Sequence, residues 1–98
     1  MTEFTLSENS ILGLMPEAGI KRLLGERLPD PARSTGVPRA ELYLVVNRPL
    51  DYHRRAIEAG ATELSGLEKR DWGQRVAYSL DLDSHVLAFA EQIESESE

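Results

Sequence analysis

The chain has two histidines, His53 and His85, and histidine is the side chain that most often acts as acid, base or metal ligand near neutral pH. His85 directly follows the turn Asp81-Leu82-Asp83-Ser84, and strand alternation sets it on the opposite face from Ala88. This position favours a structural role at the turn over a role as ligand or base. His53 falls on or beside the packing face of a predicted helix, where a half-buried imidazole with one satisfied nitrogen is the ordinary outcome.

The carboxylates and aromatic residues offer binding chemistry. Glu41 and Tyr43 alternate along a β-rich run and therefore share one face of a predicted strand. A lone carboxylate such as Glu41 can recognise a cationic ligand or simply face solvent, and Tyr43 can stack on a ligand or join the core. Asp81 and Asp83 flank a tight turn, where Asp side chains accept backbone N–H groups without any metal.

Several other chemistries have no counterpart in the sequence. It contains no phosphate-cradling glycine loop, no G-x-S-x-G nucleophile elbow and no H-E-x-x-H zinc helix. Five basic residues precede the predicted strand at 40–47 and indicate a solvated loop or, less favourably, an anion-recognition loop; they are Lys21, Arg22, Arg27, Arg33 and Arg39.

Composition describes one small domain of 98 residues with a formal net charge of -6, which opposes the phosphate backbone of nucleic acids. The absence of cysteine removes disulfides and thiolate chemistry and agrees with a reducing compartment. No apolar run is long enough to cross a bilayer, and the first residues lack the pattern of a secretory signal. We therefore expect a cytoplasmic protein that binds neither nucleic acid nor membranes.

The elements that position these residues follow from periodicity and turn chemistry. Two short strands at 4–6 and 11–15 flank a turn at 7–10, and a short helix ends at Gly25. Residues 26–38 hold three of the five prolines and predict a surface loop without regular structure.

A second region shows a clearer succession. A strand at 40–47 leads into a helix that starts at Pro49, stops at Gly60 and buries Leu50, His53 and Ile57. Three further strands are predicted in ATELSGL, QRVAYSLD and HVLAFAEQ. The prediction is an α+β protein in which residues 39–90 form a βαβββ module after a hairpin and a short helix, with an acidic tail at 91–98.

Residues 39–90 resemble the second half of a vicinal oxygen chelate domain, the superfamily of glyoxalases, bleomycin-resistance proteins and ring-cleaving dioxygenases. The resemblance rests on a strand entering a helix that ends in Ala59-Gly60-Ala61, on Trp72-Gly73 before a strand, and on the turn Asp81-Leu82-Asp83-Ser84 before His85. It implies two βαβββ modules whose sheets curl around a small-molecule pocket. Residues 1–38 then look like a partial first module, and a missing opening strand and helix favour pairing with a second copy within one structural domain. A natural truncation or a late start of the sequence are the alternatives.

The resemblance also implies where a divalent metal would bind. Glu41 occupies a ligand position on the first strand of the module, but the matching position on the last strand is Ala88, which cannot ligate. The run ILGLM, the presumed last strand of the first module, offers no ligand either, whereas a catalytic site needs about three. We expect no cofactor, with Glu41 the only weak metal candidate.

The function expected from the resemblance is metal-independent binding of a small organic molecule in a concave cleft. Glu41, Tyr43 and Trp72 are the predicted ligand-binding residues, Trp72 because its loop resembles the edge of the family's pocket. Two alternatives remain open: a metal-dependent lyase or dioxygenase of the same superfamily, and a degenerate module that acts only in protein pairing. No catalytic residue is predicted, and the sequence does not name the ligand.

Overall fold

The computed structural model describes residues 1–93 and confirms the α+β class. The chain divides into two compact units, which we call the N-terminal unit (Met1–Thr35) and the sheet unit (from Gly36 onward). The predicted acidic tail at 91–98 begins too early, because Glu91 and Gln92 belong to the last strand; residues 94–98 lie outside the described part. Neither α-helix of the described residues is long and apolar enough to span a membrane.

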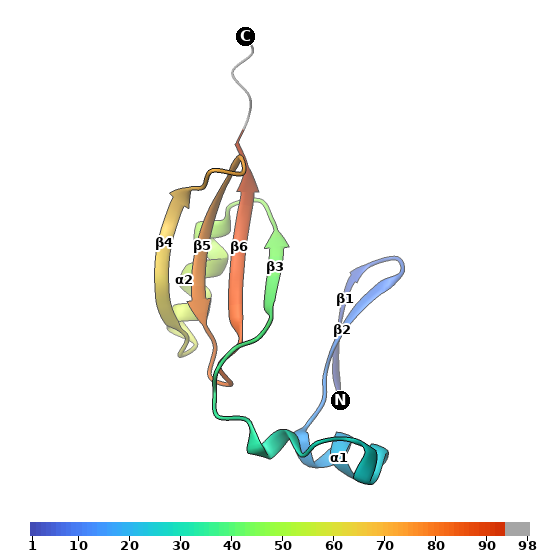
Figure 1. Ribbon diagram of the computed structural model, residues 1–98. Helices are drawn as coiled ribbons and strands as arrows, with labels where there is room; N and C mark the ends of the chain where they lie inside the picture. The colour runs from blue at the N-terminus through green and yellow to red at the C-terminus, as the bar shows by residue number, and fades with distance from the viewer. Residues whose placement is uncertain (94–98) are drawn as a thin grey trace. The chain divides into compact units, whose positions relative to one another are not determined.

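The N-terminal unit contains the predicted hairpin and short helix (Figure 1). Strands β1 (Thr2–Ser7) and β2 (Ser10–Leu14) are antiparallel, with Ser7 opposite Ser10 at the turn. Helix α1 (Glu17–Leu24) ends at Gly25, whose φ of 66° is a left-handed conformation that glycine adopts readily. No residue of this unit is buried.

The prediction that residues 26–38 lack regular structure is wrong in part. Two single-turn 3-10 helices, η1 (Gly25–Arg27) and η2 (Pro31–Arg33), occur in this region. The second forms because the Asp30 side chain accepts a hydrogen bond of 3.0 Å from the Ala32 amide while Pro31 supplies a preset φ.

The sheet unit is the predicted βαβββ succession. It consists of β3 (Glu41–Val45), α2 (Pro49–Glu58), β4 (Thr62–Lys69), β5 (Gln74–Leu80) and β6 (Val86–Gln92). The strand order is β3-β6-β5-β4, with β3 parallel to β6 and the other pairs antiparallel. Since β3 and β4 are opposite edges, α2 connects one edge to the other across a single face of the sheet (Figure 1).

Helix α2 packs with a face that differs slightly from the predicted one. Pro49 and His53 are buried and Ile57 is partly buried, but Leu50 is 44% exposed. Positions four apart share a helix face, so Pro49 and His53 define the face that packs on the sheet. Leu50 lies beside this face and is therefore partly exposed. Tyr52 then stacks on Phe89 of β6 with ring centroids 5.7 Å apart.

The sheet has a second face, which the helix does not cover; we call it the helix-free face. Alternation from the register places Tyr43, Val76, Tyr78, Ala88 and Ala90 on it. Val76, Ala88 and Ala90 are fully buried and form a small core with the two tyrosines packed against them. This is the face that the sequence predicted for ligand binding.

Candidate functional site

Two of the three predicted ligand-binding residues come together on the helix-free face. The Trp72 Nε1–H donates a hydrogen bond of 2.9 Å to the Tyr43 hydroxyl, although 29 positions separate the two residues. Tyr43 is placed by β3 and Trp72 by the β4–β5 turn, where Gly73 has a φ of 90°. Trp72 remains 53% exposed to solvent.

Tyr43 of β3 also contacts β5, which is separated from β3 by β6. Its hydroxyl donates to the Oε1 atom of Gln74 on β5, and Gln74 Nε2 in turn donates to Gln92 Oε1 over 2.8 Å. Since β6 lies between β3 and β5, the Tyr43 side chain passes over β6. Trp72, Tyr43, Gln74 and Gln92 therefore form one hydrogen-bonded chain of side chains across the sheet.

The middle of the helix-free face is consequently filled. Tyr43 and Tyr78 pack against Val76, Ala88 and Ala90, so the residue at the expected metal-ligand position, Ala88, is completely enclosed. Glu41, Tyr43 and Trp72 do not line any of three depressions on the surface of residues 1–93, which lie beside α1, at the end of α2 and beside Tyr52.

Glu41, the third predicted ligand-binding residue, lies apart from Tyr43 and Trp72 on the helix-free face. It lies opposite Val86 at the first position of β3, whereas Tyr43 extends toward Gln74 at the far end of β5. Within residues 1–93 its exposed carboxylate makes no hydrogen bond or ion pair. The pKa of Tyr78 is raised, chiefly by burial and then by the negative charge of the Glu41 carboxylate.

Arg70, which the sequence did not single out, organises the edge of this face. Its Nη2 atom donates to the Ser65 hydroxyl at 2.8 Å and to the Gly66 and Val76 carbonyls at 3.3 and 2.8 Å. These acceptors lie at the irregular part of the β4–β5 ladder, where the register shifts between Ser65 and Glu68. The guanidinium also lies over the Tyr78 ring at 5.1 Å.

His53 has one partnered nitrogen, as predicted, but it is more deeply buried than the half-buried imidazole that the sequence predicted. Only 3% of it is exposed, its Nε2 lies 2.9 Å from Glu63 Oε2, and its Nδ1 has no partner. Ser79, opposite Glu63 in the sheet, is fully buried with an unpaired hydroxyl. Ser79 and His53 are thus buried at the α2–sheet interface beside the largely exposed Glu63, and the buried Ser79 hydroxyl is inaccessible to a substrate.

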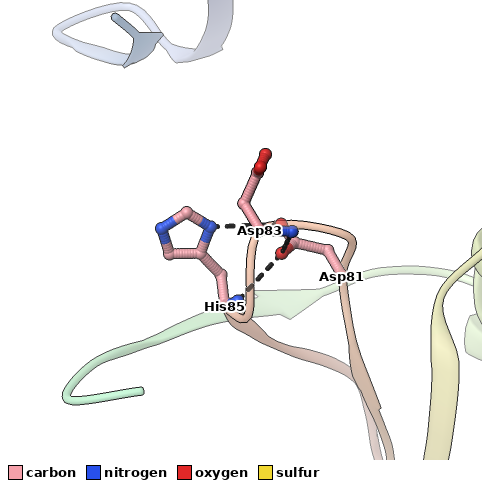
Figure 2. Close-up of side chains that lie close together, drawn as sticks. All are labelled: Asp81, Asp83 and His85. Atoms are coloured by element: carbon pink, nitrogen blue, oxygen red, sulfur yellow. Dashed lines mark hydrogen bonds and ion pairs between the residues drawn. The ribbon is translucent and has the colours of Figure 1, made fainter. Parts of the chain in front are cut away.

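Asp81, in the turn between β5 and β6, is a further titratable group whose pKa is shifted (Figure 2). Asp81 Oδ1 accepts hydrogen bonds from the Asp83 and His85 amides at 2.9 and 2.8 Å, and Asp81 Oδ2 lies 3.2 Å from His85 Nδ1. Partial burial raises the pKa of Asp81, but the two amides and the imidazole outweigh it, so the pKa lies below its ordinary value. The turn chemistry predicted for Asp81 is confirmed.

Asp81, Asp83 and His85 are also the residues that come nearest to a metal-ligand set in the described structure. One potential ligand atom from each lies within 4.8 Å of the others. Both oxygens of Asp81 are already engaged within the turn, and Asp83 and His85 are exposed. The turn geometry accounts for this cluster without an ion.

Two of the five basic residues that the sequence singled out, Lys21 and Arg22, lie on α1. Lys21 Nζ donates to the Gly25 and Leu28 carbonyls at 3.0 and 2.5 Å and so completes the end of α1. Lys21 and Arg22 line a depression together with the acidic Glu17 and Asp30. This arrangement supports the interpretation as a solvated structural segment.

No family model matches the chain, and no curated protein matches its sequence. Strand alternation correctly placed Tyr43 on the same face as Glu41. It offered no signal for Arg70, because no pattern of residue types marks a bulge whose carbonyls accept from one guanidinium.

Proposed function

We propose that the protein is a metal-independent small-molecule binding protein that resembles the bleomycin-resistance branch of the vicinal oxygen chelate superfamily. The observation that carries this proposal is the Tyr43–Trp72 hydrogen bond on the helix-free face of a βαβββ sheet. Aromatic groups held rigidly by a polar atom, with one ring half exposed, suit the stacking of an organic ligand. A cytoplasmic location belongs to the same proposal and rests on the cysteine-free sequence.

The donor set supports binding without a metal. Ala88 is enclosed beneath Tyr43 and Tyr78, and β2 carries no carboxylate, imidazole or amide side chain. Glu41 is then the sole ligand that the resemblance supplies, whereas a catalytic divalent site uses about three protein ligands. This count disfavours the metal-dependent lyase or dioxygenase.

The filled centre of the face determines how a ligand would bind. A ligand either stacks on the exposed part of Trp72 or displaces the Tyr43 side chain from Gln74, which exposes the Ala88 and Ala90 surface beneath. Displacement exchanges a hydrogen bond whose net contribution is about 1 kcal/mol for contact with apolar surface. Glu41 and the Tyr78 hydroxyl would line the newly opened space on the other side of Tyr43.

Fluorescence provides a direct test, because Trp72 is the only tryptophan. We expect some members of a library of planar organic molecules to change Trp72 emission saturably, and Tyr43→Ala to change the affinity of each by at least about fivefold, roughly 1 kcal/mol. Tyr52→Ala, on the helix-covered face, is the matched control and should leave affinity unchanged. Saturable binding that responds equally to both substitutions, or no binding at all, would contradict the proposal.

A second candidate function, protein pairing, is favoured by the N-terminal unit. None of its 35 residues is buried, and Phe4, Leu6 and Leu14 on one face of the hairpin are each about half exposed. A two-stranded hairpin is marginally stable on its own in water. We propose a homodimer, which analytical ultracentrifugation would detect as a concentration-dependent mass; a monomer at all concentrations would contradict it.

A further inference from the structure

A groove in the sheet unit lies apart from the helix-free site. It runs between the C-terminal end of α2, the residue that leads into β4, and the β5–β6 turn, and its volume is about 270 Å³. Its lining consists of Ala56, Ala59, Ala61, Asp81, Leu82, Asp83 and Leu87. Five of these seven residues are apolar and two are acidic. The groove therefore has an apolar wall and, beside it, two carboxylates.

Glycine makes this shape possible. Gly60 has a φ of 114°, and a Cβ atom at this position would lie 3.2 Å from the Leu82 side chain. Leu82 therefore rests against the backbone that follows α2, although 78% of the residue is exposed. The apolar wall remains open to solvent.

The charged residues that line the groove are both acidic. Asp81 is held as a carboxylate by the amides of Asp83 and His85, and Asp83 has no hydrogen bond or ion pair from its carboxylate within residues 1–93. The C-terminal end of α2 adds the partial negative charge of a helix terminus. No lysine or arginine is among the lining residues.

We propose that this groove binds a small organic cation, a primary ammonium or guanidinium group on a short aliphatic chain. Asp83 pairs with the cationic head while Ala56, Ala59 and Leu87 contact the aliphatic chain. A bare metal ion would gain nothing from the apolar wall, and both oxygens of Asp81 already have partners in the turn. Charge complementarity and the apolar lining together select an amphipathic cation.

The probe for this site is n-butylammonium, titrated into the full-length protein and followed by ¹H–¹⁵N NMR. We expect saturable shifts of the Ala59, Ala61 and Leu82 amides. 1-Butanol and butyrate have the same chain length without the positive charge, and each should bind at least about threefold more weakly, as expected for loss of one partly exposed ion pair. Equal binding of 1-butanol would overturn the proposed role of charge.

Two substitutions locate the site. Asp83→Asn should weaken n-butylammonium binding about threefold to fivefold, whereas Glu8→Gln, which removes the same charge from the turn of the β1–β2 hairpin, should leave binding unchanged. Ala59→Leu should abolish the shifts by filling the groove. Unchanged binding in both Asp83→Asn and Ala59→Leu, or zinc binding at Asp81 and His85 without any ammonium binding, would overturn the proposal. Neither outcome bears on Tyr43 and Trp72, so the two sites are tested independently.

Discussion

Asp81 supports the β5–β6 turn through a single carboxylate that accepts two backbone amides and faces an imidazole. Replacing it by alanine leaves the Asp83 and His85 amides without this acceptor. We expect Asp81→Ala to reduce the free energy of unfolding by about 1 kcal/mol at neutral pH, the usual net contribution of an intramolecular hydrogen bond. Urea denaturation followed by circular dichroism would measure the change.

The pH dependence of this effect follows from the lowered pKa of Asp81. Because the folded-state pKa lies below the unfolded-state value of about 3.9, the carboxylate stabilises the fold above that value. The stabilisation disappears as pH falls through the folded-state pKa. The difference between wild type and Asp81→Ala should therefore still be present at about pH 5 and shrink below about pH 4. A difference that is undiminished at about pH 2 would contradict this expectation.

Tyr43 contributes to the helix-free face through its ring and through its hydroxyl, and Tyr43→Phe separates the two. The ring still packs on Ala88 and Ala90, but Trp72 Nε1 and Gln74 Oε1 lose their shared partner. We expect a loss of about 1 kcal/mol in the free energy of unfolding and a red shift of Trp72 emission as the indole becomes more hydrated. Unchanged emission would show that the hydroxyl does not hold Trp72.

At the scale of elements, the β4–β5 ladder depends on Arg70. The guanidinium satisfies two backbone carbonyls and the Ser65 hydroxyl where the strands change register. Arg70→Met keeps most of the aliphatic stem and removes these bonds, so we expect a loss of about 2 kcal/mol in the free energy of unfolding. The control is Lys69→Met, because Lys69 directly precedes Arg70 and its side chain is exposed. It should change the free energy of unfolding by less than about 0.5 kcal/mol.

The packing of α2 on the sheet contains a polar group that makes no bond. The Ser79 hydroxyl is fully buried without a partner, so its removal relieves a desolvation penalty. We expect Ser79→Ala to be neutral or to stabilise the protein by up to about 1 kcal/mol. Thermal unfolding would check it; a destabilisation above about 1 kcal/mol would mean that the hydroxyl has a partner such as a buried water.

The elements were largely predictable from the sequence because their signals are local. Pro49 and Gly60 set the start and stop of α2, and alternation set the face of Tyr43. The rotation of α2 that exposes Leu50 was not predictable, since it depends on how Tyr52 meets Phe89 from another strand. The filled face was not predictable either, because it depends on Tyr43 crossing β6 to reach Gln74.

At the scale of the whole molecule, the two units differ in what stabilises them. The sheet unit has a buried core, whereas the N-terminal unit buries no residue and exposes the apolar side chains of its hairpin. If a second copy covers the hairpin, as we propose, the amides of β1 and β2 should exchange slowly in the dimer and quickly on dilution to the monomer. Hydrogen exchange at two protein concentrations measures this, and exchange that is independent of concentration would contradict pairing through the hairpin.

The central claim is that a sheet of this type binds a small molecule without a metal, and metal content tests it most directly. The full-length protein would be loaded with nickel, zinc, manganese and ferrous iron, dialysed, and analysed by elemental mass spectrometry beside Glu41→Ala and His85→Ala. We predict no stoichiometric metal that depends on Glu41. Stoichiometric metal in the wild type that is lost in Glu41→Ala and kept in His85→Ala would contradict the account and favour a metalloenzyme.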